Sequence, residues 1–182
     1  MSWNNVSRLT SREFICGFCG NLVAKATGFF DKNAQNSIYI CPHCDKPTYF
    51  DYIDSQTPGI APGNEVHNLP EKIEALYREA RNSVSVGAHT SSVLACRKML
   101  MNIAVTQGAD EGKSFISYVE YLANNGYVPP NGKGWVDHIR KKGNEATHEI
   151  ALMQQGDAEE LISFVEMLLK FIYEFPARVP KP

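Results

Sequence analysis

Four cysteines in the first third of the chain have the residue type and spacing of a metal site. They form two C-x-x-C pairs separated by 21 residues. Thiolates at positions i and i+3 of a tight turn place two sulfurs on the same side of an ion, and structural zinc takes four ligands in a tetrahedron. The sequence therefore predicts a structural Zn²⁺ held by Cys16, Cys19, Cys41 and Cys44.

The residues around these cysteine pairs indicate what kind of metal site they form. Gly17 and Gly20 favour a tight first turn, and Pro42 stiffens the second. His43 lies inside the second pair, and we expect it near the surface rather than on the ion. The same ligands could hold a rubredoxin-like iron, but nothing nearby indicates redox work. Four protein ligands also leave no open position for a catalytic water.

The composition of the chain is that of an ordinary globular protein. Of its 182 residues, 43% are apolar and 21% charged, and the formal net charge is −2. This balance excludes a polycation that coats nucleic acid. The apolar runs are too short to cross a bilayer, and the polar N-terminal residues lack the apolar segment of a secretory signal. We therefore expect a cytoplasmic protein, in which clustered thiols bind metal rather than form disulfides.

Turn residues and short β-branched runs divide the N-terminal part. We interpret residues 1–13 as a polar lead-in and residues 14–54 as a zinc-ribbon β module. Residues 55–69 are rich in Pro and Gly, which predicts a linker with neither a continuous helix nor a paired strand. Strands are expected at 21–27, 37–40 and 48–53.

From residue 70 to residue 178 the periodicity becomes helical and predicts an all-α bundle. The last helix is apolar on more than one face, so we expect it to be central to the bundle, and homodimerisation through it is compatible with this. Cys96 lies on an apolar face and is expected to be a buried core thiol. Helices are predicted from Pro70 to residue 86, from a cap at Thr90 or Ser91 to Gly108, after a cap at Ser114, around Trp135, and from a cap at Asp157 to a stop at Pro176.

A polar row interrupts this bundle. Arg140, Asn144 and His148 are four residues apart and share one face of a continuous helix, with Lys142 beside them. Such a row could hold a phosphate, or His148 could act as acid or base near a ribose 2′-hydroxyl. Alternatively, Asn144 caps a new turn and His148 forms a hydrogen bond within the bundle. We expect His89 and His138 at the surface.

The double knuckle, the Pro/Gly linker, the G-N-E-A-T-H segment and the apolar terminal helix ending in F-P together resemble the bacterial domain-of-unknown-function family 4145. That family is similar to the HEPN superfamily of helical bundles in prokaryotic defence and toxin systems. The resemblance implies a HEPN-like bundle after the zinc ribbon. It implies either a dimeric, metal-independent ribonuclease or a non-catalytic module that binds RNA or a partner protein.

In HEPN nucleases an arginine typically lies four to six residues before the histidine, whereas here Lys142 or Gly143 takes that place and Arg140 lies further upstream. Lysine lacks the planar fork of guanidinium. The departure favours a zinc-containing, non-catalytic binding module that engages nucleic acid, RNA in preference to DNA, or a partner protein, in phage defence. The alternatives are a metal-independent endoribonuclease that uses His148, and a structural subunit of a larger complex.

Overall fold

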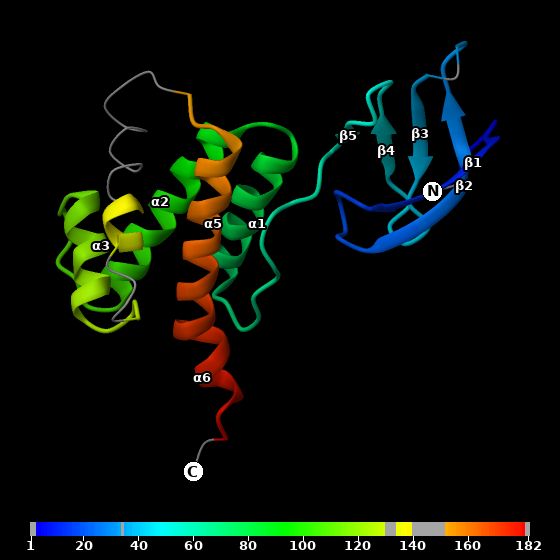
Figure 1. Cartoon of the computed structure of the whole chain (residues 1–182). Coiled ribbons are helices and arrows are strands. Elements are labelled where there is room, and N and C mark those ends of the chain that lie inside the picture. The colour runs from blue at the N-terminus through cyan, green and yellow to red at the C-terminus, as the bar shows by residue number, and fades with distance from the viewer. Residues whose placement is uncertain (1–2, 34, 130–133, 140–151, 181–182) are drawn as a thin grey trace. The chain divides into compact units, whose positions relative to one another are not determined.

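The computed structural model describes residues 3–33, 35–129, 134–139 and 152–180. The chain forms two compact units, Met1–Ala61 and Pro62–Pro182. We refer to them as the ribbon unit and the helical unit, and each is described by itself (Figure 1).

The ribbon unit is a five-stranded antiparallel sheet in the order β1-β2-β3-β4-β5, so each strand pairs with the next along the chain. Phe14, Tyr39 and Phe50 are buried on one face, with their rings 5.4 to 6.1 Å apart. This apolar cluster is small for a module of this length. The strands are β1 (Ser7–Ile15), β2 (Leu22–Phe30), β3 (Ser37–Ile40), β4 (Pro47–Phe50) and β5 (Gln56–Thr57).

The first strand corrects the expectation of a polar lead-in over residues 1–13. β1 begins at Ser7 and pairs with β2 from Ser7↔Gly28 to Ile15↔Leu22. Phe14 is its one buried residue, so the sequence carries little of the alternation that reveals a half-buried strand. This strand forms by backbone pairing with β2, and the sequence of residues 7–15 alone does not indicate that pairing.

The predicted linker over residues 55–69 is also wrong in part, because its first residues complete the sheet. Gln56 and Thr57 pair with Phe50 and Tyr49 of β4. The Gln56 side chain donates to the carbonyl oxygens of Ile15 and Pro58, each at 2.9 Å. These side-chain bonds hold a strand too short to be recognised from its sequence.

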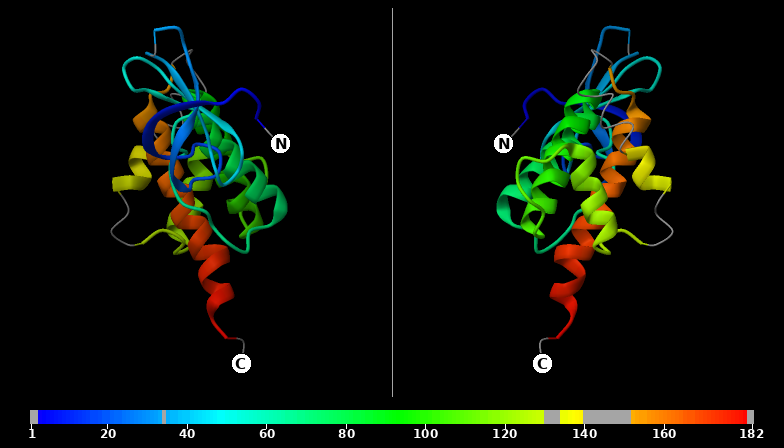
Figure 2. Two further views of the ribbon diagram at one scale, coloured as in Figure 1. Left: turned by 90° about the vertical axis from the view of Figure 1, so that its right-hand side faces the viewer. Right: turned by 90° about the vertical axis from the view of Figure 1, so that its left-hand side faces the viewer.

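The buried core of the helical unit lies among its helices, and the C-terminal helical path runs on past the ends of the others (Figure 2). Residues 134–139 are also helical, and Trp135 places its ring 4.9 Å from that of Phe164. The other elements are α1 (Glu71–Ser85), α2 (His89–Thr106), α3 (Phe115–Asn124), α5 (Gln155–Leu169), the π-helical turn η2 (Lys170–Glu174) and α6 (Phe175–Arg178).

α5 is the central helix, as its apolar composition predicts. Eight of its residues are buried, including Phe164 and Leu168, which are fully inaccessible. It packs against both α1 and α2. Cys96 of α2 is fully buried, as expected, and burial raises the pKa of its thiol to about 12. Within the described residues, no helix combines the length and apolarity needed to cross a bilayer.

Helix ends agree with the sequence in one case and differ in another. Ser114 caps α3 as predicted, and its hydroxyl oxygen accepts from the Ser117 backbone N–H. α5, however, begins two residues before Asp157. Asp157 accepts from the backbone N–H of Gln154 as the third helical residue of a capping box, so it is not the cap itself.

Pro176 does not stop the last helix. The chain widens into η2, where the Phe175 N–H donates to the Lys170 carbonyl five residues back, and then continues through α6. Proline has no N–H and its ring collides with the carbonyl of the fourth preceding residue in an α-helix. The wider turn, η2, lies just before Pro176. Pro176 itself lies in the first turn of α6, where proline is tolerated.

Residues 62–69 form a strap that lies against the helical unit. Two acidic residues of the C-terminal helical path hold it. The Glu166 carboxylate accepts from the backbone and side-chain nitrogens of Asn64 at 2.8 and 2.9 Å, and Glu174 accepts from the His67 N–H at 3.0 Å. Val66 is buried in the core of the unit. The second half of the predicted linker is therefore a fixed part of the helical unit.

A buried arginine on α2 permits a stability prediction. Arg97 is 9% exposed, its guanidinium lies 4.2 Å from the centre of the Phe115 ring, and no described residue accepts a bond from its Nη1 atom. Burial lowers its pKa. Arg97→Met keeps the packing and removes a buried charge, so we expect the free energy of unfolding to stay within about 1 kcal/mol or to rise.

Arg97→Ala is the matched comparison, because it also removes the aliphatic stem over Phe115 and should destabilise by about 2 kcal/mol. Urea titration of both variants measures the difference. A loss with Arg97→Met as large as that with Arg97→Ala would mean that the charge itself stabilises the fold.

Candidate metal centre

The four cysteines lie on two turns with the same backbone pattern. In the first turn the Cys16 carbonyl accepts from the Gly20 N–H at 2.8 Å, and the Cys16 N–H donates to Asn21 at 3.0 Å. In the second, Cys41 forms the equivalent bonds with Asp45 and Lys46, each at 2.9 Å. Each turn connects two strands, β1 to β2 and β3 to β4, so the sheet brings the two cysteine pairs together.

Each turn requires one residue with a left-handed backbone. Gly20 takes it with φ +70°, as its predicted role requires, and Asp45 takes the equivalent position with φ +59°. Aspartate tolerates this region better than most residues, because its short side chain can form local hydrogen bonds. Asp45 is not among the predicted residues, although its place one residue after the second C-x-x-C matches that of Gly20.

Gly17 has a role other than the predicted one. A Cβ atom there would lie 2.4 Å from the carbonyl oxygen of Gly59 and 2.5 Å from that of Pro58. The residue is therefore small because the chain after β5 passes directly over it. The turn itself does not require glycine at this position.

The sulfur geometry fits one metal ion. The four Sγ atoms all lie within 4.8 Å of one another, with Cys16 to Cys44 at 3.7 Å and Cys19 to Cys41 at 3.8 Å. A tetrahedral ion with metal–sulfur bonds of about 2.3 Å separates its sulfurs by about 3.8 Å, whereas a disulfide requires about 2.05 Å. The four cysteines can therefore hold a metal ion such as zinc.

The environment of the thiols also favours a cation. Burial raises the pKa of Cys16 and takes that of Cys44 to about 12. Burial acts in the same direction on Cys19, but hydrogen bonds from Asn21 and from the Cys16 and Cys44 thiols lower its pKa to about 6. Thiols this close cannot all ionise alone, because each thiolate disfavours the next. A divalent cation would stabilise all four as thiolates.

His43 lies beside the cluster rather than in it. Its Nδ1 atom is 3.1 Å from the Nδ2 atom of Asn21, which also donates to the Cys19 carbonyl at 3.3 Å. Nδ1 must be unprotonated to accept this bond. His43 thus connects the two cysteine turns through an amide, and it is not among the residues placed to bind the ion.

The other predicted site lies outside the described residues. Arg140, Lys142, Asn144 and His148 all fall there, so their role stays a prediction. The nearest described part of that segment, residues 134–139, ends with Ile139 buried and with the exposed His138 paired to Glu160 at 2.5 Å. His138 is thus a surface residue, as expected.

The fold and the cysteine cluster define a class of protein in which an antiparallel ribbon carries four clustered cysteines able to hold a metal ion, and a helical unit follows it. Comparison with known families identifies the second part. Residues 78–181 match the family described as "Domain of unknown function (DUF4145)". The chain belongs to this family. No curated protein and no solved structure matches it.

Proposed function

We propose that the chain is a non-catalytic binding module whose ribbon unit is stabilised by structural Zn²⁺. Four thiolates complete the coordination of zinc and leave no position for substrate. The ribbon unit buries one small aromatic cluster, and a module of this size usually needs a metal or disulfides in addition to its core. These observations support a role for the ion in folding.

An aromatic stripe on the outer face of the sheet carries the binding proposal. Phe29, Ile38 and Tyr49 are directly opposite one another on β2, β3 and β4, and Trp3 places its ring 6.0 Å from that of Phe29. We call these four residues the outer stripe. Their neighbours in the register, Gly28, Tyr39 and Thr48, are buried on the other face.

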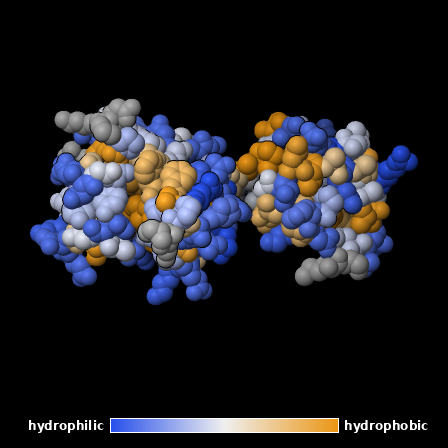
Figure 3. All heavy atoms as spheres, turned by 90° about the horizontal axis from the view of Figure 1, so that it is seen from below, coloured by the Kyte–Doolittle hydropathy of each residue, from blue (hydrophilic) through white to orange (hydrophobic). Residues whose placement is uncertain are grey.

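The outer stripe is accessible and hollowed. Trp3 and Tyr49 are 38% and 39% exposed. A shallow cavity of about 200 Å³ lies over Phe29, Ile38 and Tyr49. Apolar side chains gather on the surface of the ribbon unit in Figure 3. Exposed aromatic side chains next to polar groups are typical of protein-binding surfaces.

The charge of the ribbon unit favours a protein partner. It contains as many acidic as basic residues, and four thiolates with Zn²⁺ add a charge of about −2. A surface that binds nucleic acid would need an excess of cations. RNA stays the second candidate, because aromatic side chains on neighbouring strands can stack bases. The basic residues are Arg8, Arg12, Lys25, Lys32 and Lys46, and the acidic ones are Glu13, Asp31, Asp45, Asp51 and Asp54.

The helical unit supports the rest of the proposal by resemblance. Its likeness to the HEPN superfamily supports a role in phage defence, with homodimerisation through the bundle. Phe171 and Phe175 are 51% and 43% exposed on the C-terminal helical path, which suits a contact with a second copy.

Photo-crosslinking tests the outer stripe. We expect benzoylphenylalanine in place of Tyr49, in the full chain inside its own cells, to capture one partner protein. The same group in place of Val86, which is 63% exposed on the helical unit, is the matched control. Ile38→Lys, which puts a charge in the centre of the stripe, should abolish the Tyr49 crosslink. Equal capture from both positions would contradict the proposal, and capture of RNA from position 49 would assign the second candidate.

A nuclease assay tests the non-catalytic part of the proposal. Incubation of the purified chain with RNA in the presence of EDTA should leave the RNA intact, and His148→Ala should change nothing. Cleavage that persists in EDTA and disappears in His148→Ala would establish the metal-independent ribonuclease instead.

A further inference from the structure

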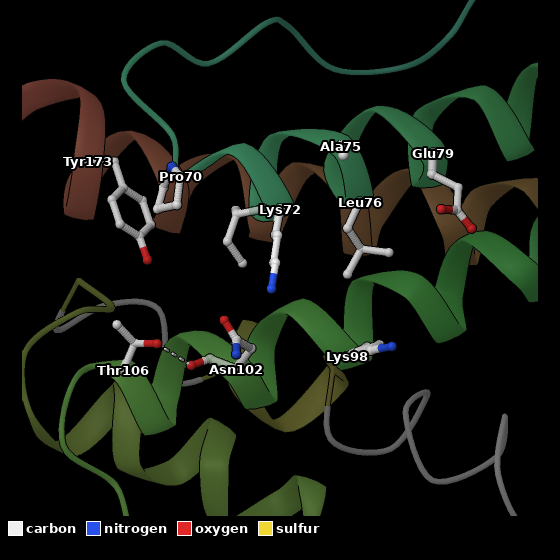
Figure 4. A pocket seen from close by; sticks show the side chains of 10 residues that line it. Pro70, Lys72, Ala75, Leu76, Glu79, Lys98, Asn102, Thr106 and Tyr173 are labelled. Atoms are coloured by element: carbon white, nitrogen blue, oxygen red, sulfur yellow. Dashed lines mark hydrogen bonds between the residues drawn. The ribbon is translucent and has the colours of Figure 1, made fainter.

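A groove between α1 and α2 has the features of a second binding site, separate from the ribbon unit. Its volume is about 620 Å³. Ile73, Ala75 and Leu76 of α1 form an apolar wall, and Tyr173 of η2 lies at the end near Pro70 (Figure 4). The lining residues that the structure describes all belong to the helical unit.

Hydrogen-bond donors gather at one end of this groove. Figure 4 shows Lys72 extending from α1 toward Asn102 of α2, with the Tyr173 hydroxyl directed to the same side. Thr106 contributes no donor, since its hydroxyl donates to the Asn102 carbonyl at 2.9 Å. Burial raises the pKa of Tyr173, so its hydroxyl stays a donor at neutral pH.

The charges of the groove are not neutralised within the described chain. Neither Lys72 nor Lys98 forms an ion pair with any residue that the structure describes. Glu79 is the one acidic residue of the described lining, and Figure 4 places it near the far end, where Lys98 also lies. It disfavours an anion there, so a negative group belongs at the Lys72 end.

We propose that this groove binds an apolar monocarboxylic acid, with its carboxylate on Lys72, Asn102 and Tyr173 and its apolar body against Ile73 and Leu76. A carboxylate offers about four lone-pair sites, enough for these three groups. Two lysines and one glutamate leave a net charge of +1, which suits a monoanion better than a phosphate dianion. The described lining also lacks the arginine fork that phosphate favours.

Calorimetric titration of the full chain with octanoate tests the proposal. We expect saturable binding of one octanoate per chain. Lys72→Met and Asn102→Leu should each weaken it about tenfold or more, because each removes a bond to a charged group. Lys113→Met is the matched control, because Lys113 lies beside Asp110 on a loop outside the groove and this variant should bind octanoate like wild type. Lys72 and Asn102 are exposed, so their variants should fold.

Three further titrations test which chemical group binds and where it comes from. Octanol and inorganic phosphate should bind at least tenfold more weakly than octanoate. Equal binding of octanol, tighter binding of phosphate, no saturable binding of octanoate, or unchanged binding by Lys72→Met would each overturn the proposal. Acetyl-Gly-Leu-Leu then identifies the source. Tighter binding than octanoate assigns a peptide C-terminus and weaker binding a free acid, and either result supports the carboxylate site.

Discussion

Cys16→Ser or Cys41→Ser is expected to unfold the ribbon unit while the helical unit stays folded. Both thiols are fully buried, and serine neither replaces a thiolate ligand nor fills its volume. Structural zinc contributes on the order of 10 to 16 kcal/mol to the folding of small zinc modules at neutral pH. The small cluster of Phe14, Tyr39 and Phe50 cannot compensate for a loss of that size.

Metal analysis and NMR of the full chain measure this result together. Wild type should contain one zinc ion per chain, and chelation should remove the dispersed amide signals of the ribbon unit and spare those of the helical unit. Cys96→Ala is the matched control, because it removes a buried thiol of the helical unit and should keep the metal. A Cys16→Ser chain with one bound ion and an intact ribbon spectrum would refute the tetrathiolate assignment, as would a wild-type chain without stoichiometric metal.

Glu166→Ala should destabilise the helical unit by about 2 to 4 kcal/mol at neutral pH. It removes the acceptor of both Asn64 nitrogens and the partner of Lys170. It also leaves the Tyr77 hydroxyl, 3.4 Å from Glu166, with the Asn64 carbonyl as its remaining partner. Thermal and urea unfolding measure the loss. Glu160→Ala, on the same helix in an exposed pair with His138, should cost about 1 kcal/mol or less.

The contribution of Glu166 should also depend on pH. Burial on its own would raise the pKa of this carboxyl, but hydrogen bonds from Lys170 and Asn64 outweigh it and hold the pKa below the ordinary value of 4.5. The unfolded state therefore binds the proton more readily, and the stabilisation is complete above pH 4.5 and lost as the pH falls through the lower, folded-state pKa.

Glu166→Gln isolates this effect, because Glu174 is retained and titrates in both chains. Wild type should lose its stability advantage over Glu166→Gln below about pH 4.5. An advantage that stays constant down to pH 3 would show that the carboxylate does not stabilise the strap through its charge.

The cysteine cluster could be predicted from the sequence because its thiols are paired within four residues of each other. The C-x-x-C spacing predicts that the two thiols of each pair lie on one tight turn, and Gly20 indicates where the first turn ends. The helices were visible for a similar reason, since apolar periodicity and the Ser114 cap are local features. The structure adds Asp45, where aspartate takes a role that the sequence suggested for glycine alone.

What the sequence did not predict depends on residues far apart in the chain. Asn64 and Glu166 are separated by 102 residues, and no local pattern connects them. One signal was present, however. Glu166 and Glu174 are acidic residues inside a mostly apolar stretch, and a carboxylate that a helix buries must find donors elsewhere. Likewise, β1 has one buried residue among nine, so its sequence indicates a strand only when β2 is placed beside it.

The strap has a mechanical consequence. The chain leaving the ribbon unit reaches Asn64 and His67 before it reaches α1, and those residues are fastened to Glu166 and Glu174. Tension applied through a bound partner would therefore be borne first by the bonds from Arg81 to the Pro62 and Gly63 carbonyls, and then by the bonds to Glu166 and Glu174. Force would reach the first turn of α1 only after those bonds had broken.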